Sequence, residues 1–407
     1  MSGYSVSSRS KKRKVKWIIF SLLPLVFLLL FVEILLRVIF PTPFLTPDNY
    51  PGIYVTHPKW GHDLAPRIDV HGFGYGVERF SRFVTNNYSF IRSEDTDPRD
   101  RKIRRTLVLG DSHLHGVVDY RDNLTMVAER KLNANGKKKY EILNGGVGVF
   151  SLYQEFLKAK HLIPEIRPER VVILTYLGND ALEMDTGGSG PVLNDDGSEP
   201  NYTAKRYHPK SDVSFETVYF RSYNFLKGVV LPFFHFEVRD KMDQSAKQIG
   251  LASYRDLRGA VSQSRGQARY FCQHPERIEI CFNKIDLTVK KLKELAGNNI
   301  EVLFLLLPSE IQIQNYASNQ AVMVADYLGI GDCKTLRFET LFMKHLEDRL
   351  TDLDIPFINF LSLFQGEQVS NLYWFDGHID IKAHRLIGEV IADYIIPKSA
   401  AEKPGGG

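Results

Sequence analysis

The stretch TLVLGDSHLHG, residues 106–116, decides the fold. An apolar run ends on Gly110, Asp111 and Ser112 and leads into two histidines and another glycine. Gly, Asp and Ser are common in tight turns, so this stretch is compatible with a plain strand-to-helix connection. It also suits a nucleophile, because a serine directly after a buried strand is held at the carboxyl end of that strand. The remainder of the sequence distinguishes these two interpretations.

Strand-like and helix-like segments alternate around this stretch. Continuous apolar runs separated by segments of helical spacing predict a parallel sheet that helices cover on both faces. The expected strands lie at 105–110, 140–146, 170–178, 300–309 and 356–360, and the last helix is expected at 381–395. Asp380 stands where the N-cap of that helix is needed. His384 falls on the face of the helix that packs inward.

Composition divides the chain of 407 residues into five parts. In the segment 182–280 the apolar residues show no sustained period. The segment is also too long for a simple connection, so we expect an insertion there. Residues 41–102 are rich in Pro, Gly and aromatic residues and are expected to form a membrane-proximal stalk with short strands. The predicted parts are a basic tail at 1–16, a transmembrane helix at 17–40, the stalk at 41–102, the α/β domain at 103–397 and a flexible tail at 398–407.

The apolar segment 17–40 is long enough to cross a bilayer, because 24 helical residues span about 36 Å. It follows a cluster of Lys and Arg and is not followed by a small-residue cleavage site, so a signal anchor is favoured over a cleaved signal peptide. The positive-inside rule then places the tail in the cytoplasm and the body outside it, in the periplasm or at the cell surface. Glu33 and Arg37 interrupt the apolar run four residues apart, which lets them pair on one helix face.

Charge outside the tail excludes a nucleic-acid partner. Six of the 52 Lys and Arg residues precede residue 17, so the 48 acidic residues slightly outnumber the basic ones in the remaining chain. An extracytoplasmic body permits disulfides. Cys272 and Cys281 are close enough in sequence to form a disulfide, which would leave Cys333 unpaired. Free buried thiols are an equal alternative.

Four polar stretches follow strands or precede the last helix. They contain Ser112, the loop NGGVGVFS at 144–151, Asn179 in LGND, and the Asp376/His378 pair in FDGHID. In open parallel sheets, functional groups gather beyond the carboxyl ends of the strands. A hydroxyl, glycine-rich backbone amides, a side-chain amide and an Asp/His pair are what serine acyl transfer requires.

On these four stretches the chain resembles the SGNH (GDSL-like) hydrolase superfamily over residues 103–181 and 299–395. The resemblance implies a three-layer α/β/α, flavodoxin-like fold. It also implies that Ser112 is the nucleophile, His378 the base and Asp376 its partner, with Asn179 in the oxyanion hole. Asp380 also lies nearby, but its capping position explains it better. The Asp-x-His spacing resembles the polysaccharide O-acetylesterase and O-acetyltransferase branches.

The loop at 144–151 departs from the family pattern. Related sequences place a glycine where this chain has Val149, and Gly148 stands one position early. An oxyanion donor needs only its N–H, so the resemblance implies Gly148 or Val149 as the donor, the latter if its φ and ψ permit.

The histidines at 113, 115, 378 and 384 do not complete a ligand set with carboxylates or cysteines, so neither a metal nor another cofactor is predicted. We expect a membrane-anchored esterase that removes acyl groups, above all O-acetyl groups, from a cell-envelope polysaccharide. An O-acetyltransferase with the same residues is the first alternative, and it would need an envelope-biosynthesis partner to supply the acyl donor. The second is a non-catalytic glycan-binding or assembly protein.

Overall fold

A five-stranded parallel sheet forms the centre of the computed structural model. The structure describes residues 7–39, 50, 52–73, 80–134, 140–188, 190–204, 220–226, 264–313, 338–365, 367, 372–373 and 377–396. The strand order is β6-β5-β7-β8-β9, and every pairing in it is parallel. In chain order this is the 2-1-3-4-5 arrangement of flavodoxin-like folds. The predicted α/β fold with a central parallel sheet is therefore confirmed. The strands are β5 (Arg104–Gly110), β6 (Tyr140–Asn144), β7 (Arg170–Tyr176), β8 (Glu301–Leu307) and β9 (Phe357–Asn359).

Helices cover both faces of the sheet, because successive residues of each strand point to opposite sides. Val171 and Ile173 of β7 belong to one buried cluster, and Val172 and Leu174 belong to the other. The first face carries α4 (Leu152–Ile166), α5 (Asp180–Thr186), α11 (Ser264–Gln273), α12 (Arg277–Ala296) and α15 (Phe338–Asp352). The second carries α3 (Leu124–Leu132), α13 (Glu310–Ile313), α16 (Leu361–Phe364) and α17 (Ile381–Ile395).

The last helix begins and packs as its sequence predicts. Asp380 is the N-cap of α17, and its Oδ1 accepts a hydrogen bond of 2.9 Å from the Ala383 amide. His384 is fully buried, and its Nδ1 accepts a hydrogen bond of 3.3 Å from the amide of Leu124, the first residue of α3. The first residues of α4, Leu152–Phe156, are buried as well.

Two short hairpins precede the sheet. Strands β1 (Tyr54–His57) and β2 (Gly61–Leu64) form one, and β3 (Asp69–Phe73) and β4 (Phe80–Val84) form the other. Their buried side chains, which include Trp60 and Phe83, share an apolar cluster with Val147 and Phe150 of the loop after β6. The segment 52–84 thus contributes directly to the surroundings of that loop.

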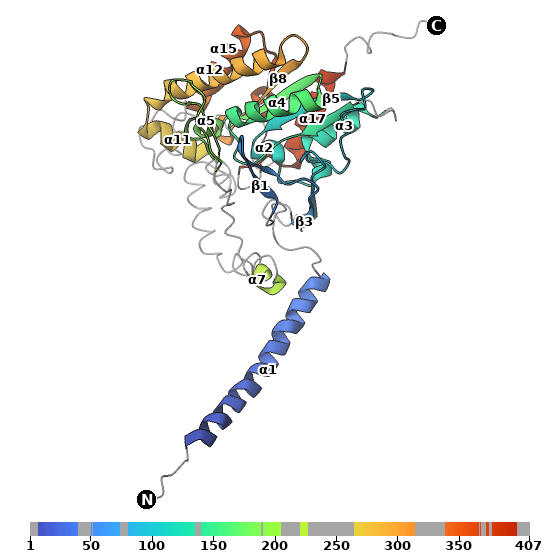
Figure 1. Ribbon diagram of the computed structural model, residues 1–407, viewed down its shortest axis with the longest axis vertical. Coiled ribbons are helices and arrows are strands. Elements are labelled where there is room, and N and C mark those ends of the chain that lie inside the picture. Colours follow the sequence, from blue (N-terminus) through green and yellow to red (C-terminus); the bar gives the residue numbers. More distant parts are fainter. Residues whose placement is uncertain are drawn as a thin grey trace, which may run out of the picture.

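Helix α1 (Ser7–Ile39) projects away from the body, and α7 (Arg221–Phe225) lies beside its end nearest the body (Figure 1). Within the described residues, α1 is the helix long and apolar enough to cross a membrane, over Leu22–Ile39. By length and composition it fits either a signal anchor or a signal peptide. Glu33 and Arg37 form the expected ion pair, with Nε and Oε1 2.8 Å apart.

Of the two alternatives for the cysteines, the structure excludes the disulfide between Cys272 and Cys281. Cys272 is disulfide-bonded, whereas Cys281 is a free, buried thiol, so these two residues do not form a bridge. The Sγ of Cys281 instead lies 3.2 Å from the Ala181 carbonyl, to which it donates a hydrogen bond. Cys333 lies outside the described residues.

Candidate active site

Ser112 begins a one-turn helix, α2 (Ser112–His115), immediately after β5. Asp111 caps this turn, because its Oδ1 accepts a hydrogen bond of 2.9 Å from the His113 amide. A side chain at Gly110 would lie 3.0 Å from the Leu174 carbonyl oxygen, so the strand end tolerates only glycine there. Ser112 is partly exposed, and its hydroxyl donates a long hydrogen bond of 3.4 Å to Asp111 Oδ2. The turn therefore presents the hydroxyl at the carboxyl end of the sheet.

His378 lies beside this turn although it comes from the far end of the chain. Its ring centroid is 5.2 Å from that of His113, the neighbour of Ser112. Burial raises the pKa of Asp111 and lowers the pKa values of His115 and His384, and positive charge on His378 would lower all three, so the imidazole lies near these groups. The stretch around 112 and the stretch around 378 are thus brought together. Asp376, its predicted partner, lies outside the described residues.

Hydrogen bonds anchor the segment that carries His378. The Tyr373 hydroxyl donates a hydrogen bond of 2.6 Å to the Pro308 carbonyl at the end of β8, and Tyr373 forms an antiparallel bridge with Ile379. Gly377 has a φ of 89°, which favours glycine, and this lets the chain turn directly before His378.

The loop after β6 packs on the Ser112 turn. The Val147 amide donates a hydrogen bond of 3.1 Å to the Gly110 carbonyl, and a side chain at Gly146 would lie 2.6 Å from the His115 amide nitrogen. A Cβ at Gly148 would be 4.0 Å from the Ser112 Cβ. The backbone of Gly148, one of the two predicted oxyanion donors, therefore lies near the candidate nucleophile.

Val149, the other predicted donor, has a φ of 65°. This left-handed conformation is unusual for any residue with a side chain, and it is an outlier for a β-branched one. It is the conformation that a glycine at this position would adopt freely. Val149 therefore adopts a backbone geometry that favours glycine, at the position where the sequence comparison predicts one.

Asn179, the third predicted donor, stands at the start of α5 at the end of β7. Its Nδ2 donates a hydrogen bond of 3.0 Å to Glu183 Oε1, and its amide also hydrogen-bonds to Asp111. Because β5 and β7 are neighbours in the sheet, Asn179 and Ser112 lie on either side of the point where the strand order reverses. The amide is oriented by two carboxyl groups.

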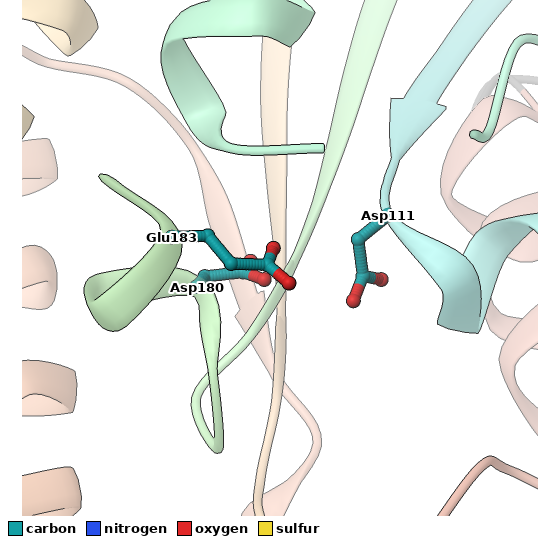
Figure 2. Close-up of side chains that lie close together, drawn as sticks. All are labelled: Asp111, Asp180 and Glu183. Carbon is teal, nitrogen blue, oxygen red and sulfur yellow. The ribbon is translucent and has the colours of Figure 1, made fainter. Parts of the chain in front are cut away.

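Figure 2 shows that Asp111, Asp180 and Glu183 point their carboxyl groups toward one another. One oxygen from each lies within 4.8 Å of the others, and all three residues are buried. Burial raises the pKa of Asp111 to about 6 and raises the pKa values of Asp180 and Glu183 well above their usual range. Carboxylates this close do not all ionise at neutral pH, so the cluster retains protons that its members can share.

Glu155 of α4 extends this cluster. It is 1% exposed, and burial together with the charges of Asp111 and Glu183 raises its pKa well above the usual range. Neither of its carboxylate oxygens has a hydrogen-bond partner among the described residues. A protonated Glu155 avoids the free-energy cost of an unpaired buried charge.

His62, His115 and His384 are buried, and their pKa values are lowered. Burial lowers the pKa of His62 to about 4, and burial with the charge of His378 lowers that of His115 and of His384 to about 3. His62 donates a hydrogen bond of 2.9 Å from its Nε2 to the Gly148 carbonyl. The described residues that cluster with metal-ligand spacing are carboxylates rather than these histidines.

Sequence reasoning missed several residues that surround the predicted positions. His62 and Tyr54 come from the first hairpin, where the Tyr54 hydroxyl would lie 3.0 Å from a Cβ at Gly148, and no spacing in the sequence links that hairpin to the loop at 144–151. Glu183 could have been found, since it lies one helical turn after Asn179. Glu155 follows the polar residue Gln154 at the start of α4, so the local sequence does not indicate a buried carboxyl group there.

No family model matches the sequence, and the search of curated proteins returns no match. The structure matches solved SGNH/GDSL-like lipases and acetyl esterases. An acetyl xylan esterase, AlAXEase, is 12% identical with a TM-score of 0.37, covering 72% of this chain and 100% of its own. A lipase/acylhydrolase from Enterococcus faecalis is 13% identical with a TM-score of 0.35, covering 75% and 100%. Est24, a carbohydrate acetylesterase from Sinorhizobium meliloti, is 11% identical with a TM-score of 0.36, covering 72% and 98%.

Proposed function

We propose that this protein is a membrane-anchored serine esterase that acts outside the cytoplasm. The observation that carries the proposal is the approach of His378 to the Ser112 turn, with its ring 5.2 Å from that of His113, near the loop of Gly148 and the amide of Asn179. A structural role alone does not call for a partly exposed hydroxyl, an imidazole and amide donors in one place.

In this mechanism the Ser112 hydroxyl attacks the ester carbonyl while His378 takes its proton. Asp376 holds the imidazole in the required tautomer and stabilises the imidazolium. The oxyanion accepts hydrogen bonds from the backbone amides of Ser112 and of Gly148 or Val149, and from the Asn179 side chain. The alcohol leaves with the proton from His378. Water, activated by the same imidazole, then releases the acid and restores Ser112.

We propose an O-acetylated polysaccharide of the cell envelope as the substrate. The spacing of Asp376 and His378 supports this choice through its resemblance to the polysaccharide O-acetylesterase branches. The basic tail and apolar helix support placement of the body on the outer side of the membrane. The disulfide at Cys272 fits an oxidising compartment.

The test is hydrolysis of a chromogenic acetyl ester by the full chain in detergent. We expect Ser112→Ala to lower kcat/KM by about 10³-fold or more, whereas Ser198→Ala, at an exposed serine of the 191–200 loop, leaves it unchanged. Activity that survives in Ser112→Ala would contradict the proposal. Acetylated product that appears on addition of a glycan acceptor would instead identify an O-acetyltransferase.

A further inference from the structure

Helix α7 is a short element, far from the candidate active site, that contacts the apolar helix α1 (Figure 1). The contact is made by Glu33, a charged residue in an otherwise apolar helix. Glu33 Oε1 accepts hydrogen bonds of 2.8 Å from the Arg221 amide and from Arg37 Nε. Its Oε2 accepts hydrogen bonds of 2.8 and 2.9 Å from the amide and hydroxyl of Ser222.

These four hydrogen bonds satisfy both oxygens of the carboxylate. A charged carboxylate in an apolar surrounding is costly unless it is paired and hydrogen-bonded. Glu33 is paired with Arg37 on its own helix, and the first turn of α7 supplies the remaining donors. The charged residue that interrupts the apolar run is therefore a docking point for α7.

The docking point has a defined depth along α1. The apolar span runs over Leu22–Ile39, and Glu33 precedes its end by six residues, which is about 9 Å along a helix. Counted from Trp17, directly after the basic tail, the roughly 20 helical residues that cross the hydrocarbon core end near Leu36, so Glu33 lies within about one helical turn of the outer interfacial region. Helix α7 is bound to α1 at this same level.

The surface of α7 suits that environment. Three exposed residues, named here its stripe, belong to α7 and its two caps: Phe220 at the N-cap, Tyr223 within the helix and Leu226 at the C-cap, which are 45%, 41% and 47% exposed. On α1, Ile34, Leu35 and Val38 are also exposed at the same level. Aromatic side chains with a polar tip prefer the boundary between lipid headgroups and acyl chains.

We propose that α7 is a second membrane contact, whose stripe of Phe220, Tyr223 and Leu226 inserts into the outer interfacial layer of the bilayer. The proposal rests on the proposed membrane anchoring by α1. With two attachments, the body is held close to the membrane surface, and the substrate has to be reachable from there.

The test uses tryptophan as a depth probe in the full chain reconstituted into nanodiscs whose acyl chains are brominated near the headgroup. Tyr223→Trp and Phe220→Trp report on α7. Phe31→Trp, in the apolar span, reports on α1. Leu341→Trp is the control, since it is 52% exposed on α15, at the end of the body farthest from α1 (Figure 1). The added fluorescence of each variant is measured against the parent chain.

We expect brominated lipid to quench roughly half or more of the added fluorescence at positions 220, 223 and 31, and to leave that at 341 unchanged. Quenching at position 31 without quenching at 220 and 223 would overturn the proposal while α1 remains a membrane anchor. Absence of quenching at all three positions would overturn both. Esterase activity of the same samples tests the proposed reaction separately.

Discussion

At the scale of single residues, the site combines a strained backbone with side chains that hold one another in place. Val149 has a positive φ beside the candidate nucleophile, and Asn179 is oriented by Glu183 and Asp111. Strain of this kind persists where the surrounding structure imposes it, and functional sites are where it is commonly found.

Replacing Val149 by glycine tests the strain. A non-glycine residue in the left-handed region costs about 1–3 kcal/mol, whereas the greater entropy of glycine in the unfolded chain costs about 0.5–1 kcal/mol. We therefore expect Val149→Gly to raise the free energy of unfolding by about 1 kcal/mol, measured by urea denaturation in detergent. Val55 is a similarly exposed valine in strand β1, and Val55→Gly is expected to lower the free energy of unfolding. Equal losses in both variants would contradict the assignment of strain to Val149.

Asn179→Ala tests the predicted oxyanion donor. Removal of one such donor costs about 10²–10³-fold in kcat, because the hydrogen bond forms only in the transition state. We expect that loss with little change in KM for a chromogenic acetyl ester. Glu183→Gln keeps an acceptor for the Asn179 amide and is expected to retain more activity than Glu183→Leu. An Asn179→Ala variant with the parent kcat would exclude the amide from the reaction.

At the scale of elements, the close packing of α17 against α3 positions the C-terminal segment that carries His378. Gly388 lets α17 approach α3 closely, since a Cβ at this position would lie 2.5 Å from the Leu124 carbonyl oxygen and 2.8 Å from Val127 Cβ. The same helix begins at Ile381, three residues after His378, so its placement also positions the candidate base.

Alanine substitutions at two glycines in helices are expected to change the free energy of unfolding in opposite directions. Gly388→Ala forces α17 and α3 apart and is expected to lower the free energy of unfolding by about 1–3 kcal/mol. In Gly266→Ala, in α11, the added Cβ meets only Leu182 Cδ2, at 3.5 Å. The higher helix propensity of alanine is therefore expected to raise the free energy of unfolding by about 0.5–1 kcal/mol. Urea denaturation of both variants measures the difference, and a stabilised Gly388→Ala variant would contradict the packing described here.

The sequence predicted the elements well because their patterns are local. Apolar runs such as 170–178 give buried parallel strands, and Asp380 caps its helix as expected. The site was predictable where residues follow strand ends, as Ser112 and Asn179 do. His62 and Glu155 were missed because their roles depend on tertiary contacts with Gly148 and Asp111. The sequence left a Cys272–Cys281 bridge and free thiols as equal alternatives, because sequence proximity does not determine which thiols come together, and the structure excludes that bridge.

At the scale of the whole molecule, buried titratable groups give stability a defined dependence on pH. For Asp111, Glu155, Asp180 and Glu183 the folded pKa is raised, so their contribution is complete at low pH and is lost as pH rises through the folded values. For His62, His115 and His384 the folded pKa is lowered, so their contribution is complete above about 6.5 and is lost as pH falls toward 4. These opposite slopes predict maximal stability at mildly acidic pH, between the ordinary pKa values of a carboxyl group and of a histidine.

Glu155→Gln is expected to flatten the alkaline side of this profile. The variant removes a carboxyl group whose ionisation opposes folding, so the loss of stability between pH 6 and 9 is expected to be smaller by on the order of 1 kcal/mol. Glu165→Gln, at an exposed position on the same helix, is the control. Urea denaturation across this range makes the measurement, and identical profiles for parent and Glu155→Gln would show that Glu155 does not titrate against folding.

The most direct measurement is covalent labelling of the full chain with a fluorophosphonate, which reacts with serines that an adjacent base activates. We predict one adduct, located by peptide mass spectrometry on Ser112. It is expected to be absent from Ser112→Ala, strongly reduced in His378→Ala and unchanged in His274→Ala, at an exposed histidine of the body. A folded protein that remains unlabelled at Ser112, or that is labelled equally in His378→Ala, would contradict the pairing of these two residues.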